Sequence, residues 1–292
     1  MSEGLLAAAG RALGARIEGA SPVGGGDINR AWRLELEGGT LAFLKSRPDA
    51  PADEFGAEAA GLRWLGEPGG LPVPEVLAVL DEAGERGLVL EWIDPGRLDG
   101  AGEEALGRGL ALVHEAGAGG YDALPPGSPR RALRFGGIEV GVGLGESWAD
   151  VYGTRLEELA EVALDRGRIS PSCRTLVESV RGRLGELGGP PEPPARIHGD
   201  LWSGNVLAGA DGRPWLIDPA AHGAHREMDL AMLDLFGSVS ARTEAAYSDV
   251  HPLGEGWRGR LELWQIQPLL VHAILFGGSY GHAAERAASA YA

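Results

Sequence analysis

The sequence predicts an α+β protein of two lobes, in which a small antiparallel sheet with one helix precedes a larger, mostly helical lobe. Polar and apolar residues alternate over much of the first ninety residues, as in half-buried strands, whereas later segments repeat apolar residues at helical spacing. The chain has 292 residues, 44% hydrophobic and 23% charged, which suffices for sizeable cores. We place the lobes at residues 1–93 and 94–292.

The clearest element of the first lobe is a β-hairpin. Alternating residues over 31–37 and 41–45 flank Gly38-Gly39, a pair suited to a tight turn between antiparallel strands. The other elements predicted in this lobe are a short helix over 5–15, a helix over 53–65, and strands over 76–80 and 87–92.

The second lobe is predicted to be helical, and a Pro-rich connector at 187–196 divides it. Helices are expected over 103–115, 148–166, 172–187, 227–237, 241–247 and 257–276. A cleft between a sheet lobe and a helical lobe is a natural place for a ligand.

The charge and cysteine content exclude several classes of protein. The net charge is −16 and no block of basic residues is present, so we expect no nucleic-acid partner. Cys173 is the single cysteine, which rules out an intramolecular disulfide. No secretory leader and no apolar stretch of about 18 residues is evident, so we expect a cytoplasmic protein that does not enter a membrane.

The segment HGDLWSGNVLAGADGRPWLIDPA, residues 198–220, carries the strongest chemical signal. A hairpin through 208–212 would bring Asn205 close to Asp218, and their side-chain oxygens suit Mg²⁺. Asp200 is then left to orient an attacking hydroxyl. A base, an Asn ligand and a second Asp ligand at this spacing are typical of kinase-type phosphoryl transfer. Any one of these residues alone would more simply be a loop or cap residue.

Phosphoryl transfer of this kind also needs a lysine for the α- and β-phosphates and a helical glutamate to hold it. Lys45 is the single lysine of the chain, and it lies at the end of the second hairpin strand. Glu58, thirteen residues further on in the predicted helix, is its expected partner; Glu54, one turn earlier, is the alternative.

Two backbone segments are candidates for contacts with a nucleotide. Gly24, Gly25 and Gly26 would let amides approach phosphates without obstruction by a Cβ, although a plain turn would read the same way. The backbone from Glu91 to Ile93 could bind an adenine edge, or could simply end a buried strand.

On the acceptor side, Trp202 could stack on a sugar or contact a cationic amine, or could instead pack beneath the loop. Glu227 and Asp229 stand near a predicted helix start, where one of them could hold the loop and Glu227 is the candidate for contact with the substrate. His198 is expected to brace the loop, and His272 is assigned to the core.

Together these residues carry a resemblance to a known family. GGGDINRAW, FLK, FGAEAAGLRWL, LVLEWI, HGDLWSGNVL, LIDPAAHGAHREMDLAML and HAILFGGSYG are similar to the fructosamine kinase (ketosamine-3-kinase) family. Two segments depart from the family's usual pattern, the Gly-rich part of 131–160 and HGAH at 222–225, and both are expected to face the acceptor.

The resemblance implies a bilobal protein-kinase-like fold shared with aminoglycoside and choline phosphotransferases. It also implies ATP and Mg²⁺ as cofactors and a sugar-amine acceptor such as a fructosamine or ribulosamine. Asp200 would be the catalytic base, Asn205 and Asp218 the metal ligands, and Lys45 with Glu58 the phosphate-binding pair. Phosphorylation of an aminoglycoside or another metabolite, and a non-catalytic nucleotide-binding module, remain as alternatives; the oligomeric state is open.

Overall fold

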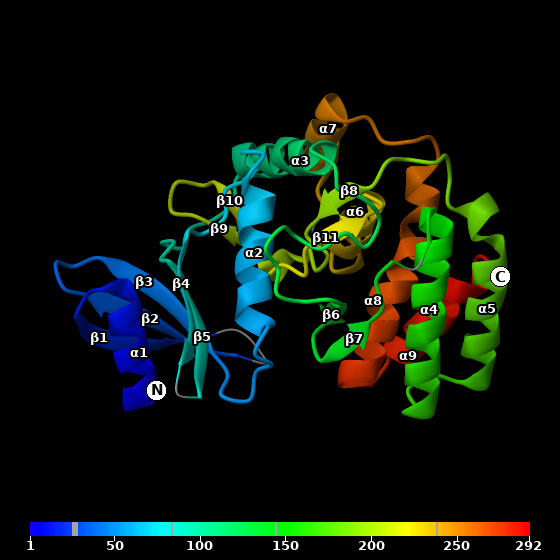
Figure 1. Ribbon diagram of the computed structural model, residues 1–292. Helices are drawn as coiled ribbons and strands as arrows, with labels where there is room; N and C mark the ends of the chain where they lie inside the picture. The colour runs from blue at the N-terminus through cyan, green and yellow to red at the C-terminus, as the bar shows by residue number, and fades with distance from the viewer. Residues whose placement is uncertain (25–28, 83, 144, 238) are drawn as a thin grey trace.

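The computed structural model describes residues 1–24, 29–82, 84–143, 145–237 and 239–292. A sheet lobe and a helical lobe lie side by side, and helix α2 (Glu54–Gly66) stands between them (Figure 1). The proposed division between residues 93 and 94 falls in the connection from the last strand of the sheet to helix α3 (Gly100–Glu115).

One antiparallel sheet forms the first lobe, with strand order β1-β2-β3-β5-β4. The strands are β1 (Ile17–Val23), β2 (Arg30–Leu36), β3 (Leu41–Ser46), β4 (Val76–Glu82) and β5 (Glu85–Glu91). The β2–β3 hairpin confirms the prediction from Gly38-Gly39. Strand β1 was not predicted, because an edge strand with Gly19, Ser21 and Pro22 is mostly exposed and has no apolar alternation.

Two helices cover the two faces of this sheet. Helix α1 (Glu3–Leu13), capped by Ser2, buries Leu5 and Ala9 in a cluster that includes Val89. Helix α2 buries Phe55, Ala59 and Leu62 in a second cluster with Leu88 and Leu90. Since neighbouring residues of a strand face opposite sides, β5 is buried on both faces and reads as a continuous apolar run.

The second lobe is helical, as predicted, with short two-stranded ladders between the helices. Its helices are α3, α4 (Trp148–Asp165), α5 (Pro171–Leu187), α6 (Glu227–Leu235), α7 (Ala241–Val250), α8 (Leu261–Phe276) and α9 (Tyr280–Ser289). Single 3₁₀ turns occur at Ser203–Asn205 and Trp257–Arg260. Helix α9 was not predicted, because it is short and rich in alanine. None of the described helices has the length and apolar character needed to cross a bilayer.

The ladders were predicted only in part. They are β6 (Leu133–Phe135) with β7 (Ile138–Val140), β8 (Ala195–Ile197) with β11 (His222–Ala224), and β9 (Val206–Ala208) with β10 (Pro214–Leu216). The β9–β10 hairpin was predicted, and directly beyond it the Ile217 amide donates to the Asn205 carbonyl at 3.1 Å. This hairpin brings the two ends of the 198–220 segment together.

Helices α3 and α7 cross closely, and Gly107 makes the approach possible. A Cβ built on Gly107 would lie 2.1 Å from the Thr243 carbonyl oxygen, which belongs to rigid helical backbone. Gly182 offers a comparison, because a Cβ there would meet nothing within 4 Å.

We therefore expect Gly107→Ala to lower the free energy of unfolding by about 2–3 kcal/mol, because the helices must separate. Gly182→Ala, at an exposed position of helix α5, should instead raise the free energy of unfolding by up to about 1 kcal/mol, because alanine has the higher helix propensity. Chemical denaturation of both variants measures this difference. Equal stability of the two variants would contradict the close packing of α3 on α7.

Candidate active site

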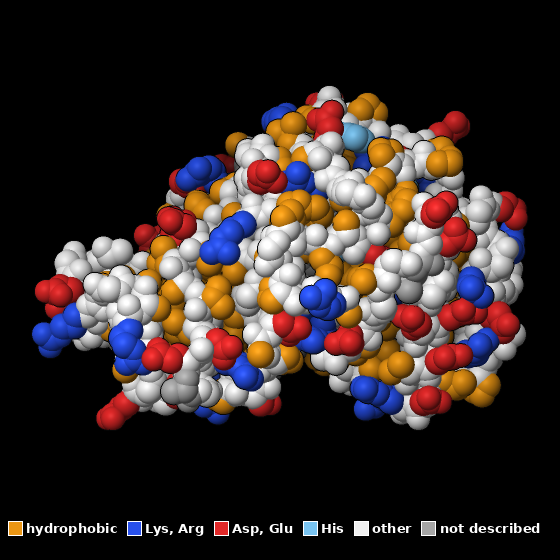
Figure 2. Space-filling model, viewed as in Figure 1, with side chains coloured by type: hydrophobic (Ala, Val, Ile, Leu, Met, Phe, Trp, Pro, Cys, Tyr) orange, Lys and Arg blue, Asp and Glu red, His pale blue; other side chains and the backbone are white. Residues whose placement is uncertain are grey.

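Residues of both lobes line one cleft with a volume of about 1040 Å³. It runs from Gly24, Glu91 and Ile93 of the sheet lobe, past Lys45, Asp200, Asn205 and Asp218, to an aromatic end on the helical lobe. Basic and acidic side chains are interspersed on the face shown in Figure 2, with apolar side chains exposed between them.

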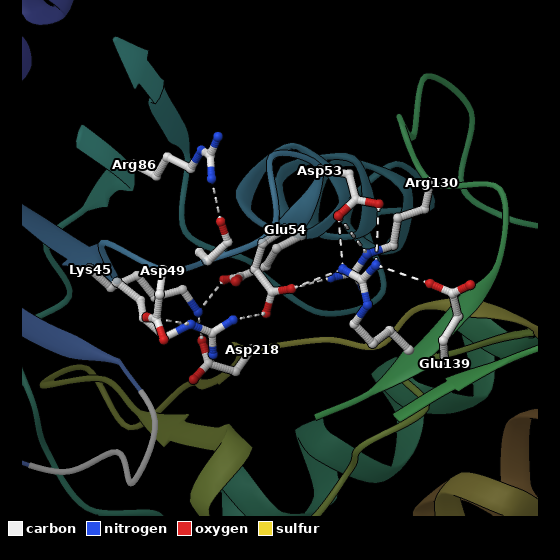
Figure 3. Close-up of polar contacts among 12 residues, drawn as sticks. Lys45, Asp49, Asp53, Glu54, Arg86, Arg130, Glu139 and Asp218 are labelled. Atoms are coloured by element: carbon white, nitrogen blue, oxygen red, sulfur yellow. Dashed lines mark hydrogen bonds and ion pairs between the residues drawn. The ribbon is translucent and has the colours of Figure 1, made fainter. Parts of the chain in front are cut away.

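Lys45 stands where strand β3, helix α2 and the segment after β10 meet. Its Nζ lies 2.6 Å from Glu58 Oε1 and 2.5 Å from Asp218 Oδ1 (Figure 3). The predicted partner, Glu58, therefore makes the ion pair. Burial disfavours the charged ammonium, but the two carboxylates outweigh that cost and raise the pKa of Lys45.

One ammonium between two carboxylates leaves this trio with excess negative charge. Burial and the Asp218 charge raise the pKa of Glu58 to about 7, although Lys45 opposes the shift. The Asp218 carboxyl has the opposite balance: burial opposes its ionisation, but the charge and hydrogen bond of Lys45 hold its pKa below the usual range. The excess negative charge of the trio favours binding of a further cation next to Asp218.

Asp218 also has an uncommon backbone conformation, with φ of 54° in the left-handed region. Aspartate tolerates this region better than most residues, and such conformations concentrate at functional sites. The turn directs the carboxylate from the end of β10 back toward Lys45.

The loop from His198 to Asn205 is held from below by one buried carboxylate, Asp229. It accepts the His198 amide at 2.7 Å and the Gly199 amide at 2.9 Å, and it faces His114 Nε2 at 3.2 Å. His198 braces the loop as expected, with its Nε2 donating to the Ile217 carbonyl at 2.8 Å. Asp229 is thus the acid of the pair Glu227/Asp229 that holds the loop.

Asp200 and Asn205 are joined by direct contacts. Asn205 Nδ2 donates to the Asp200 carbonyl at 2.7 Å and to Asp200 Oδ2 at 3.1 Å, which leaves Asn205 Oδ1 as the oxygen available to a ligand. Burial, with smaller contributions from the Asp218 and Asp229 charges, raises the pKa of Asp200 to about 7 against the effect of the Asn205 hydrogen bond. Asn205 Oδ1 and the Asp218 carboxylate are hard oxygen donors and fit Mg²⁺.

At the sheet-lobe end, Gly24, Glu91 and Ile93 line the cleft, while Gly25 and Gly26 lie outside the described residues. The Glu91 amide donates to the Glu75 carbonyl at 2.8 Å, so it is already occupied.

The other end of the cleft is a wall of aromatic rings. Trp202 contacts Phe236 with ring centroids 6.0 Å apart, Phe236 contacts His272 at 5.5 Å, and His272 contacts Phe276 at 5.6 Å and Tyr280 at 5.0 Å. Trp202 is 40% exposed and so is not a core residue. His272 Nδ1 donates to the Pro268 carbonyl at 2.7 Å, and burial lowers the pKa of His272, which favours the neutral ring.

The prediction for Glu227 was wrong. The Glu227 carboxylate is fully buried and does not line the cleft. It accepts hydrogen bonds from Arg260 Nη2 at 2.6 Å and from Trp264 Nε1 at 2.7 Å. Segment 222–225 is also buried rather than facing the acceptor, whereas Phe135 and Gly136 of the Gly-rich segment do line the cleft.

Glu192, His225 and Glu227 lie close enough to suggest a metal site, but Arg226 and Arg260 already neutralise the two carboxylates.

The wall residues Phe236, His272, Phe276 and Tyr280 were not found from the sequence. Helix α8 is apolar on all sides, so its pattern does not separate the face toward the core from the face toward the cleft. His272 was assigned to the core for this reason, and the structure corrects that assignment.

The fold and the cleft define a small-molecule kinase of the protein-kinase-like class. An aminoglycoside phosphotransferase, solved in a ternary complex with ADP and hygromycin B, has the same fold, with a TM-score of 0.65 over 97% of this chain and 96% of the other at 16% identity.

Within that class, the fructosamine kinase family model matches residues 5–291, and the chain belongs to this family. A probable ketoamine kinase from Thermus thermophilus is 36% identical over 96% of this chain and 97% of its own. A putative fructosamine-3-kinase structure from Thermobifida fusca has a TM-score of 0.89 at 40% identity and covers 100% of this chain and 99% of its own. The protein is an ATP-dependent phosphotransferase with an alcohol group as acceptor, which sets aside the non-catalytic alternative.

We expect Asp229→Asn to lower the free energy of unfolding at pH 7 by about 2–4 kcal/mol, because an amide cannot accept from three donors. Burial opposes ionisation of Asp229, but the His114 hydrogen bond and nearby charges keep its native pKa low. Its contribution is therefore complete above the unfolded-state pKa of about 3.9 and is lost as pH falls through the native value.

Denaturation of wild type and Asp229→Asn at a series of pH values checks this expectation. The gap in stability between them should narrow from pH 6 to below about 4. A gap that widens on acidification would contradict the assigned role of the carboxylate.

Proposed function

We propose that the protein phosphorylates a sugar hydroxyl of a ketosamine, with Asp200 as the base and Mg²⁺ held by Asn205 and Asp218. One observation carries this proposal: Lys45 of the sheet lobe, paired with Glu58, lines a single cleft together with Asp200, Asn205 and Asp218 of the helical lobe. Family membership supports the same reaction type.

The nucleotide is assigned to the sheet-lobe end of the cleft. Lys45, held by Glu58, contacts the α- and β-phosphates, and Gly24, which lines the cleft, lies over them. The Glu91 carbonyl and the Ile93 amide are two residues apart, a spacing that suits the acceptor and donor atoms of one adenine edge.

Mg²⁺, when bound, would neutralise charge on the β- and γ-phosphates. The Asp218 carboxylate contacts Lys45, so in this scheme it changes partners when phosphates bind. Phosphates arriving beside Lys45 would replace that carboxylate and leave it free to act as a ligand together with Asn205 Oδ1.

Asp200 orients the acceptor hydroxyl and receives its proton as the hydroxyl oxygen bonds to the γ-phosphorus and the bond from that phosphorus to the β,γ-bridging oxygen breaks. The contacts from Asn205 fix the Asp200 carboxylate in place before the acceptor binds. Positioning and charge stabilisation would supply most of the rate.

The lining of the cleft favours a ketosamine over an aminoglycoside. Among the described residues, the carboxylates that line it are Glu91, Asp200 and Asp218, and these are assigned to the nucleotide, the metal and the reaction. A polycationic acceptor would need further acids, whereas the acceptor end presents Trp202, Phe236, Phe276 and Tyr280. Aromatic faces suit the carbon skeleton of a sugar and a single protonated amine.

We expect Asp200→Ala to lower kcat by about 10³-fold or more, which corresponds to several kcal/mol of barrier. Asp211→Ala is a matched control, because Asp211 lies in the exposed β9–β10 turn and pairs only locally with Arg213. Steady-state assays with ATP and a ketosamine measure both. Full turnover by Asp200→Ala would remove Asp200 from the role of base.

The acceptor class is tested with a panel of ribulosamines, fructosamines and aminoglycosides, followed by mass spectrometry of the products. The aromatic, acid-poor end of the cleft predicts phosphorylated ketosamines and unmodified aminoglycosides. Trp202→Ala should raise the KM for the ketosamine by about tenfold, in line with loss of one ring face. Phosphorylation of aminoglycosides alone would show that the acceptor was wrongly assigned.

A further inference from the structure

The acceptor end of the cleft is connected to the Lys45–Glu58 pair through a cluster of ions between the lobes. Arg130 Nη2 lies 2.6 Å from Glu54 Oε2, and Arg134 Nη1 lies 2.8 Å from Asp53 Oδ1 and 3.3 Å from Glu54 Oε2. Figure 3 shows Arg130 facing Asp53 and Glu54 at the start of α2. We call these four residues the arginine latch.

At the start of α2, an acidic side chain makes this contact between the lobes instead of a capping hydrogen bond. Asp53 is the N-cap residue, yet its side chain makes no capping hydrogen bond, and its carboxylate reaches Arg134 instead. Burial opposes ionisation of Asp53, but the hydrogen bond and charge of Arg134 hold its pKa below the usual range. An N-cap aspartate normally bonds to the second or third amide of its helix, so here that contact is exchanged for one across the lobes.

Two glycines let α2 approach the helical lobe closely on either side of Glu58. A Cβ on Gly56 would lie 3.0 Å from Pro129 Cγ, and a Cβ on Gly61 would lie 3.2 Å from Ala221 Cβ. Helix α2 is therefore docked on the segment that carries Arg130 and on the segment that follows Asp218. Glu58 lies between these two points of contact.

The other side of the latch belongs to the wall of the cleft. Arg134 lies on β6 and is tied to Glu139 of β7 at 3.2 Å, while its neighbour Phe135 and then Gly136 line the acceptor end. An acceptor that rests on Phe135 would thus stabilise the strand that holds the start of α2. Glu54 and Glu58, four residues apart on α2, share one face.

We propose that Arg130 and Arg134 are positioning residues that couple acceptor binding to nucleotide binding through α2 and Glu58. The inference rests on the proposed function, since it takes Lys45 as the phosphate-binding residue and the aromatic end as the acceptor site. Coupling of this kind is reciprocal: the acceptor tightens nucleotide binding by the same factor as the nucleotide tightens acceptor binding.

The test uses calorimetric titration of the full chain with the non-hydrolysable nucleotide AMP-PNP and Mg²⁺, with and without a ketosamine. In wild type the ketosamine should lower the nucleotide Kd by about fivefold or more. In Arg134→Gln the nucleotide should bind at least about fivefold more weakly and the effect of the ketosamine should disappear. Arg108→Gln, which removes an exposed ion pair on α3, is the matched control and should behave as wild type.

A second variant background, Glu58→Gln, distinguishes a purely structural role of Arg134 from coupling through Glu58. If Arg134 acts through Glu58, then Arg134→Gln should change the nucleotide Kd by less than about twofold when introduced into Glu58→Gln. The full effect in that background, or wild-type affinity and wild-type response to ketosamine in Arg134→Gln, overturns the inference. If Arg134→Gln does not fold, Asp53→Asn removes the negative charge that faces Arg134 with an isosteric side chain and is judged by the same criteria.

Failure of the proposed function gives a different result. If wild type phosphorylates no ketosamine and shows no response to one, the acceptor assignment fails and the coupling fails with it. If wild type phosphorylates ketosamines but nucleotide Kd is independent of them, only the latch inference is overturned.

Discussion

The ammonium of Lys45 between Glu58 and Asp218 is the interaction on which the arrangement of the cleft depends. It joins a strand of the sheet, the helix between the lobes and the turn after β10. Removing Lys45 would leave the two carboxylates without a compensating charge, a situation that costs several kcal/mol. The trio therefore fixes the relative positions of the two lobes at the place where the reaction is proposed to occur.

A second buried carboxylate, Asp229, holds the loop in place, as Glu58 holds Lys45 in place. It accepts hydrogen bonds from two consecutive backbone amides, so the loop that carries Asp200 and Asn205 is fixed relative to α6. Gly199 makes this possible, since its φ of 79° and the carbonyl of Ala220 close by leave no room for a side chain. Asp229 thus holds the loop from outside the lining of the cleft.

The parts of the site that could be predicted are those whose residues are local in the chain or unusual in kind. Asp200, Asn205 and Asp218 flank one hairpin, and Lys45 is the only lysine. Glu58 followed from helix spacing, although Glu54 fits the same spacing and is found in the latch instead. Glu227 and Asp229 are two residues apart, so a helix turns them roughly 200° away from each other, and the sequence does not say which side faces the loop. The latch, the edge strand β1 and the wall along α8 arise only from tertiary packing, which no local pattern reports.

The burial of Lys45 has a consequence for the surface of the protein. Lys45 is the only lysine of the chain, and its ε-amino group lies inside, enclosed by two carboxylates. Reducing sugars condense with unprotonated, accessible amines, and the raised pKa of Lys45 keeps its nitrogen protonated as well as enclosed. A protein of a family named for glycated amines therefore offers almost no lysine side chain to the reaction that makes them.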